Sequence, residues 1–258
     1  MEEKIIEAAK QYGFNLEFRA SQILIENHYK VATNTIKPID EISCEADILA
    51  WDISGIAIAA ECKGTQKNSL LLAIREPNNS LNDFSIENKK VLNSEYTLGQ
   101  FKPYQDNYFF TFSGDFFKYN IKNDLSKITK NDDENNFYKA INQIQKSIIM
   151  ASKIDFPMIQ GNKVKTIIPM IITNADIYVI DYSVESEPKV SLNKWILHKA
   201  IVSRELSLPL GTTALCFPVV NIQFLSEFLK KCMIFDAYYD CYCIDDGKLS
   251  KNKNSGVL

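Results

Sequence analysis

Hydrophobic residues recur at helical spacing in several segments of the chain. The first covers residues 1 to 30, where Gly13 is predicted to separate two helices. Two further helices are predicted, at 136–153 and 221–231. The apolar face of the segment 136–153 consists of Phe137, Ala140, Ile141, Ile144, Ile148 and Ile149. A single apolar stripe on each helix indicates packing against a core on one side only.

Between these helices the pattern is typical of strands. A first strand is predicted from Tyr29, with Pro38 expected to end it, and a hairpin then follows from the segments ISCEADILAW and IAIAAECKG. The strand predicted at 164–173 is apolar almost throughout, as in a sheet covered on both faces, and another is predicted at 176–182. This order predicts an α/β fold with a central mixed sheet flanked by helices.

Two segments depart from the regular patterns. Residues 65–135 are rich in Asn, Lys, Ser and Asp around an aromatic run, which predicts an insertion with at least one hairpin and loops. The final segment, 248–258, is polar and predicted to be disordered. The whole chain, 1–258, is interpreted as a single domain with that insertion.

Composition restricts the partners and the compartment. The chain is 46% hydrophobic and 24% charged, has six cysteines, and shows neither a secretory signal nor about 18 consecutive apolar residues, so a cytoplasmic protein without a membrane partner is expected. A net charge of −3 gives no broad positive field, and any nucleic-acid binding must therefore be local. Candidates for phosphate contact are Lys89, Lys90, Lys118 and Lys122, although scattered solvated lysines are the alternative.

The predicted hairpin concentrates the chemistry of the sequence. Strict alternation in its second strand places Glu61 and Lys63 on the same face. The loop before that strand suits a three-residue turn that ends in a left-handed Gly55. In that register Asp52 pairs with Ile56, and Asp47 therefore lies opposite Glu61.

Two carboxylates at cross-strand distance repel each other unless positive charge lies between them. Lys63 supplies one charge, and a divalent cation would supply the rest, because Mg²⁺ binds one or two carboxylates and keeps waters that a phosphate can displace. Mn²⁺ binds to the same kinds of oxygen ligand. Such a site suits hydrolysis of a phosphodiester bond. The alternative is a solvated charge cluster on a surface hairpin.

Asp47, followed after a hairpin by Glu61-Cys62-Lys63, resembles the D…ExK signature of PD-(D/E)XK nucleases, the restriction-endonuclease-like superfamily. The apolar residues around Asp47 and before Glu61 look like the two strands that carry this signature. The likeness is good over about residues 14–65, and Ala46 stands where the family name has proline.

The resemblance implies a restriction-endonuclease-like core and a set of ligands. Asp47, Glu61 and the backbone carbonyl of Cys62 would hold Mg²⁺ or Mn²⁺, and Lys63 would lie at the attacking water. Glu17 is similar to a glutamate that many members place on the first core helix, where it assists metal binding. The segment from Asn136 would be the second core helix, and its Gln143 or Gln145 could correspond to a glutamine of some branches.

The expected function is metal-dependent hydrolysis of nucleic acid, with DNA as the expected substrate, in restriction or anti-phage defence. Two alternatives stay open. One is a non-cleaving nucleic-acid-binding or scaffold subunit of the same fold, which the net charge of −3 favours. The other is an RNA-directed or effector nuclease activated by a partner, as a homo-oligomer or within a defence complex.

Overall fold

A computed structural model describes residues 14–39, 42–53, 55–64, 69–75, 110–118, 129–130, 133–157, 159, 164, 166–181, 187–201, 206, 214–232, 242–245 and 248–251. Within these ranges no helix is both long enough and apolar enough to cross a membrane.

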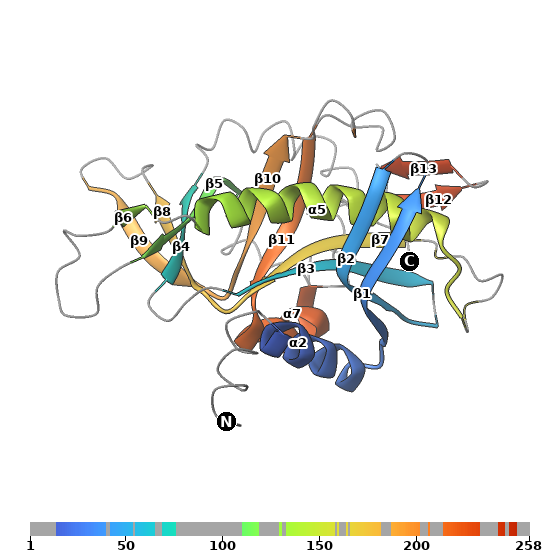
Figure 1. The fold of residues 1–258 in the computed structure, drawn as a ribbon. Coiled ribbons are helices and arrows are strands. Elements are labelled where there is room, and N and C mark those ends of the chain that lie inside the picture. The colour runs from blue at the N-terminus through green and yellow to red at the C-terminus, as the bar shows by residue number, and fades with distance from the viewer. Residues whose placement is uncertain are drawn as a thin grey trace, which may run out of the picture.

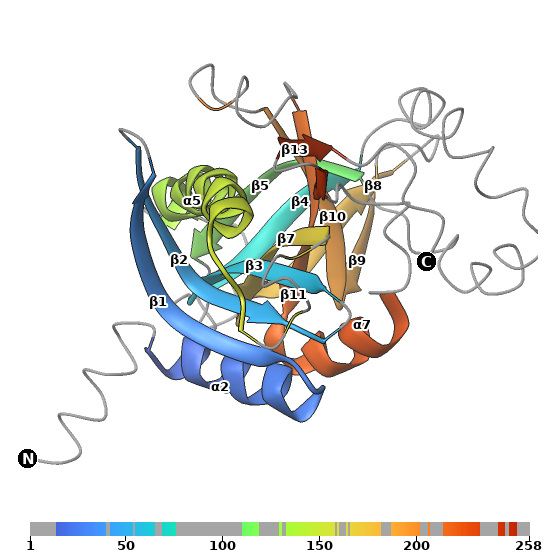
Figure 2. The same ribbon diagram turned by 90° about the vertical axis from the view of Figure 1, so that its right-hand side faces the viewer.

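The described residues form one mixed sheet with helices on both faces (Figures 1 and 2). The helices are α2 (Phe14–Glu26), α5 (Asp133–Lys153), the 3-10 helix η4 (Ile222–Phe224) and α7 (Leu225–Cys232). The strands are β1 (Lys30–Ile39), β2 (Ile42–Trp51), β3 (Ile56–Lys63), β4 (Ser69–Arg75), β5 (Phe110–Lys118), β6 (Thr129–Lys130), β7 (Thr166–Thr173), β8 (Asp176–Asp181), β9 (Lys189–Asn193), β10 (Trp195–Ile201), β11 (Ala214–Asn221), β12 (Tyr242–Asp245) and β13 (Lys248–Lys251). Their order in the sheet is β1-β2-β3-β7-β11-β10-β5-β4-β8-β9, with β6, β12 and β13 off this path.

Strand β3 lies inside the sheet, antiparallel to β2 and parallel to β7. Its side chains divide between two buried clusters, because successive residues point to opposite faces. Ala57 and Ala59 face the cluster under α5, whereas Ile58 and Ala60 face the cluster under α2 and α7. Figure 2 shows the same arrangement, with α5 on one side of β3 and α2 and α7 on the other.

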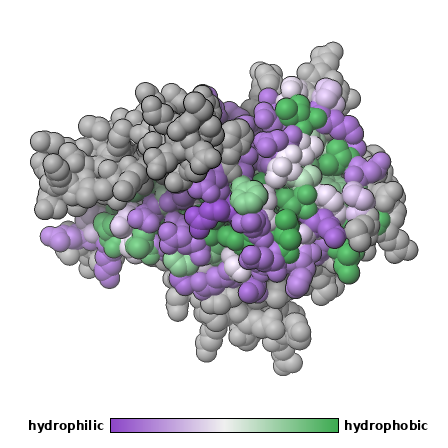
Figure 3. Space-filling model, turned by 60° about the horizontal axis from the view of Figure 1, so that its bottom comes forward, coloured by the Kyte–Doolittle hydropathy of each residue, from purple (hydrophilic) through white to green (hydrophobic). Residues whose placement is uncertain are grey.

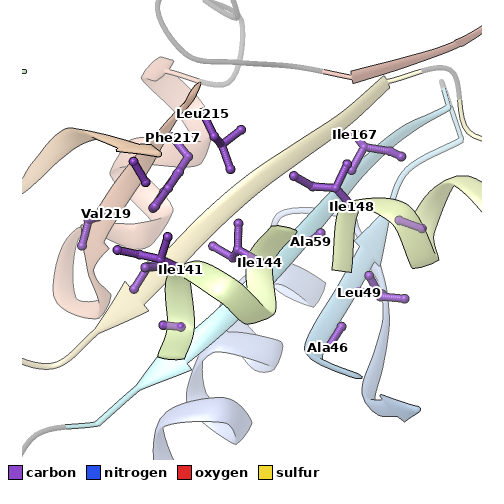
Figure 4. Packing of buried hydrophobic residues seen from close by; sticks show 14 of the residues in the cluster. Ala46, Leu49, Ala59, Ile141, Ile144, Ile148, Ile167, Leu215, Phe217 and Val219 are labelled. Carbon is purple, nitrogen blue, oxygen red and sulfur yellow. The ribbon is translucent and has the colours of Figure 1, made fainter. Parts of the chain in front are cut away.

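The apolar stripe of α5 fixes this helix across β2, β3 and β7. Ile141, Ile144 and Ile148 are buried against side chains of those strands and of β11 (Figure 4). Burial of one such side chain stabilises the fold by roughly 1.5–3 kcal/mol. The rotation of α5 about its axis is therefore set by its isoleucines, and its polar residues emerge at a defined side of the sheet.

The helix and strand predictions are confirmed in most places. Helix α2 follows directly after Gly13, whereas the helix predicted before Gly13 lies outside the described residues. Helix α5 begins at Asp133, close to the predicted 136. The strand predicted at 164–173 is β7, which is buried on both faces as expected. The predicted helix at 221–231 is formed by η4 and α7.

Two predictions were wrong. Pro38 does not end the first strand, since β1 continues to Ile39 and Pro38 pairs with Ser43. The sheet tolerates this proline because β1 is an edge strand, where a missing N–H costs no ladder hydrogen bond on the outer side. The disorder predicted for 248–258 was wrong for the first four residues, because Lys248–Lys251 form β13 against β12, whereas residues 252–258 lie outside the described structure. The available backbone partner, and not the polar composition, decides the structure of that segment.

The segment predicted as an insertion, 65–135, contributes strands to the same sheet. Strands β4 and β5 pair with each other in antiparallel fashion, as a hairpin would, and β4 also pairs with β8. The residues between them, 76–109, lie outside the described residues. Two of the strands that continue the sheet beyond β10 thus come from this segment.

The side of the molecule on which α2 and α7 lie is turned forward in Figure 3. Hydrophobic residues are scattered there among hydrophilic ones. On α2, for example, Phe18 and Ile25 are 61% and 58% exposed. Isolated hydrophobic residues of this kind are normal on a protein surface.

Candidate functional site

The turn between β2 and β3 has the geometry that the sequence predicted. Gly55 adopts a φ of 95°, and the N–H of Asp52 donates to the carbonyl of Ile56 at 3.0 Å. The Asp52 side chain accepts the N–H of Ile56 in return, also at 3.0 Å. This pairing carries through the hairpin, so that Asp47 lies opposite Glu61, one residue beyond the last pair of the ladder, Ile48 with Ala60.

The neighbouring strand β1 is irregular at this same level. Thr33 pairs with Ile48 and Thr35 with Ala46, but no pair forms between Asn34 and Asp47. Asn34 has a φ of 49°, a left-handed conformation that asparagine tolerates better than most residues. Strict alternation is broken here, because Ala46 shares the cluster under α5 with Leu49, three positions away, and not the cluster of Ile48.

The Asp47 side chain accepts a hydrogen bond from the main chain of β3, at the level where Asp47 has no paired residue on β1. Its Oδ2 accepts the N–H of Cys62 at 2.7 Å, and the residue is 8% exposed. In an antiparallel strand the N–H and C=O of one residue point to the same side. The carbonyl of Cys62 therefore faces the side on which the Asp47 carboxylate lies, as the predicted ligand set requires.

Glu61 is fully buried on the face covered by α5. Its Oε1 lies 3.1 Å from the Oγ of Ser147, which can donate to it, whereas Oε2 has no hydrogen-bond partner in the described structure. Among the described residues, the cation nearest to it is the Nζ of Lys63, at 4.0 Å from Oε2. Burial, and next the Asp47 carboxylate, raise the pKa of Glu61 to about 9, against the weaker effect of Lys63.

The amine of Lys63 is held at the edge of the site. Its Nζ donates to Oε1 of Gln143 on α5 at 3.0 Å, and the side chain is 20% exposed. The main chain of Lys63 is fixed from the other side, because its carbonyl accepts the hydroxyl of Thr173 at 2.8 Å. The amine therefore has access to solvent beside two buried carboxyl groups.

Glu17 approaches the site from α2, which covers the other face of the sheet. Partial burial, and then the nearby Asp47, raise the pKa of Glu17, while a hydrogen bond from Asn34 and the charge of Lys63 oppose the shift. In the part of the chain that the structure describes, no three acidic, histidine or cysteine side chains converge closely enough to hold a metal ion. Glu17 is thus near Asp47 but does not join Asp47 and Glu61 in one ligand group.

Three supporting residues were missed by sequence reasoning. Ser147 contacts Glu61 and also lies 2.9 Å from the carbonyls of Glu45 and Gln143. Thr173 holds Lys63, and Asn221 fixes the turn after Thr173 by donating to the carbonyl of Ala175 at 2.8 Å. The signal available was a polar residue on an otherwise apolar face, since Ser147 lies between Ile144 and Ile148 on α5.

The oxygen atoms at this site fit a hard divalent cation. Two adjacent carboxylates and one carbonyl are the ligand type that Mg²⁺ takes, with water filling the remaining positions. Comparison with models of known protein families, with characterised protein sequences and with solved structures gave no match for this chain.

Proposed function

We propose that the chain is a metal-dependent nuclease that hydrolyses phosphodiester bonds of nucleic acid, with DNA as the expected substrate. The observation that carries the proposal is the burial of Glu61 beside Asp47. Two ionised carboxylates are unfavourable at this buried position, so that burial and the Asp47 carboxylate raise the pKa of Glu61 to about 9, and Oε2 of Glu61 has no hydrogen-bond partner in the described structure. A bound cation would satisfy this oxygen and neutralise the pair.

Asp47, Glu61 and the carbonyl of Cys62 would hold Mg²⁺ or Mn²⁺. Such an ion, when bound, polarises a phosphate and makes a water more acidic. The order of elements also supports the proposal, since a helix with Glu17, the hairpin with the D…ExK residues and a second core helix follow one another as the family resemblance implies.

The protein's own groups have separate tasks in this proposal. Ser147 holds one oxygen of Glu61, so that the other points toward the cation. Lys63 presents its amine, oriented by Gln143, which donates hydrogen bonds to the attacking water or to a phosphate oxygen. The apolar residues around β3 keep bulk water from the buried carboxylates, which strengthens each electrostatic contact.

The test is cleavage of plasmid DNA, linear DNA, single-stranded DNA and RNA, with Mg²⁺, with Mn²⁺ or with EDTA. Wild type should cut only with metal. Lys63→Ala and Asp47→Asn should lower the rate on the order of 10²-fold or more. Lys189→Ala, which removes an exposed lysine of β9, is the matched control and should cut as wild type does.

A non-cleaving subunit of the same fold is the second candidate, and the net charge of −3 favours it. It predicts nucleic-acid binding without cutting under any metal. Failure of wild type to cut, together with no metal bound at Asp47 and Glu61 in calorimetry, would refute the nuclease proposal.

A further inference from the structure

Beyond its acidic first turn, which contains Asp133 and Glu134, helix α5 carries one kind of charge. Every charged residue from 137 to 153 is a lysine: Lys139, Lys146 and Lys153. They are spaced by seven residues, which is close to two helical turns, and so form a stripe along one side of the helix. Neighbours in the stripe are roughly 10 Å apart along the axis, and the stripe is about 20 Å long.

This stripe runs past the candidate site. Gln143, which accepts the Lys63 amine, lies four residues after Lys139 and three before Lys146. Residues at these separations are neighbours on a helix surface. Ser147, which contacts Glu61, lies on the adjoining inward side. The lysines of the stripe therefore lie about one helical turn from the α5 residues that hold Lys63 and Glu61, on the outward side of the helix.

A fourth lysine extends the stripe across the sheet edge. Lys37 pairs with Cys44, so both side chains lie on the same face of β1 and β2, which is the face under α5. Lys146 is close to the same Cys44, whose pKa is raised by burial and lowered in part by that lysine. Lys37, Lys139 and Lys153 are exposed, and Lys146 is half-buried.

We propose that Lys37, Lys139, Lys146 and Lys153 form the surface that binds the sugar–phosphate backbone of nucleic acid at the candidate site. The identity of the ligand as nucleic acid rests on the proposed function. The position of the lysine surface follows from the spacing of lysines on α5 and the register of β1 with β2. The repeat of roughly 10 Å matches about three steps of one strand of duplex DNA, at 3.4 Å per nucleotide. A local group of lysines also explains how a chain with a net charge of −3 could bind a polyanion, because binding needs only a basic strip beside the site.

The test is binding to a fluorescein-labelled oligonucleotide in EDTA, where nothing is cut. Single-stranded DNA, duplex DNA and RNA are each titrated over a series of NaCl concentrations with the full chain. The variant carries Lys139→Gln, Lys146→Gln and Lys153→Gln. Its control carries Lys30→Gln, Lys189→Gln and Lys230→Gln, three exposed lysines on other elements, with the same change of net charge.

Loss of three phosphate contacts should reduce the slope of log Kobs against log salt by about 2 to 3 and weaken binding on the order of 10²-fold at about 0.1 M salt. The control should keep the slope of wild type. An unchanged slope in the α5 variant, an equal loss in the control, or no binding by wild type would overturn the inference.

The two proposals fail separately. If wild type cuts with Mg²⁺ and the α5 variant cuts with the same KM, the binding surface is wrong and the nuclease stands. If the α5 lysines carry the binding but wild type cuts nothing with any metal, the surface stands and the nuclease fails.

Discussion

Substitution of the buried acid, Glu61→Gln, should stabilise the metal-free protein. Glutamine has the shape of a protonated glutamate and cannot ionise. In the folded protein the pKa of Glu61 is about 9, compared with an ordinary value of 4.5. Between these two pH values the folded chain keeps a proton that the unfolded chain releases, and folding must therefore take up a proton.

The size of the effect follows from that difference. The contribution of Glu61 to stability is fully present below pH 4.5 and is lost as the pH rises through 9, at about 1.4 kcal/mol per pH unit. At pH 7 the loss amounts to about 3 kcal/mol, which Glu61→Gln avoids. For a domain of this size the variant should unfold roughly 10 °C higher than wild type.

The assay is urea unfolding followed by circular dichroism, in EDTA, at several values between pH 4.5 and 9. The control is Glu26→Gln, at an exposed acid of α2. Its free energy of unfolding should change with pH in parallel with that of wild type. The free energy of unfolding of wild type should fall with pH relative to that of Glu61→Gln. Parallel curves for these two proteins would refute the argument that burial beside Asp47 keeps this carboxyl protonated.

Two further outcomes are expected. Mg²⁺ at about 100 times its Kd should stabilise wild type by about 2.7 kcal/mol and leave the stability of Asp47→Asn unchanged. The measurement is urea unfolding with and without EDTA. Equal stabilisation of both proteins would place the ion elsewhere. Burial lowers the pKa of His198 from 6.5 to about 4, so this group costs stability as the pH falls below 6.5, by about 2 kcal/mol at pH 5. His198→Phe, set between Phe137 and Phe217, should remove that acid-dependent loss, and an unchanged pH dependence of unfolding would contradict it.

The local part of the candidate site could be read from sequence. Alternation in β3 decides that Glu61 and Lys63 share a face, and the turn at Gly55 decides the register that brings Asp47 opposite Glu61. Both are short-range rules: a period of two residues, and a loop too short to allow another pairing. The apolar stripes of α2 and α5 are predictable for the same reason.

Other features depend on contacts between residues distant in the sequence. Ser147 reaches Glu61 from 86 positions away, and Gln143 reaches Lys63 from 80. The sequence contains both polar residues, but their direction depends on how α5 is rotated on the sheet, which the packing of its isoleucines sets. The place of the lysine stripe beside the site depends on the same rotation of α5, whereas the phosphate contacts predicted from sequence were Lys89, Lys90, Lys118 and Lys122, whose side chains lie outside the described structure.

The strand positions show the same division. The sequence by itself determined which segments form the hairpin, the helices α2 and α5 and the buried strand β7, because side-chain periodicity is a local property. Only the tertiary structure decided that β4 and β5 extend the sheet, that Pro38 is tolerated at an edge and that Asn34 breaks the alternation beside Asp47. Each of these depends on which backbone groups find partners across the sheet, and the sequence of one segment does not specify the segment with which it pairs.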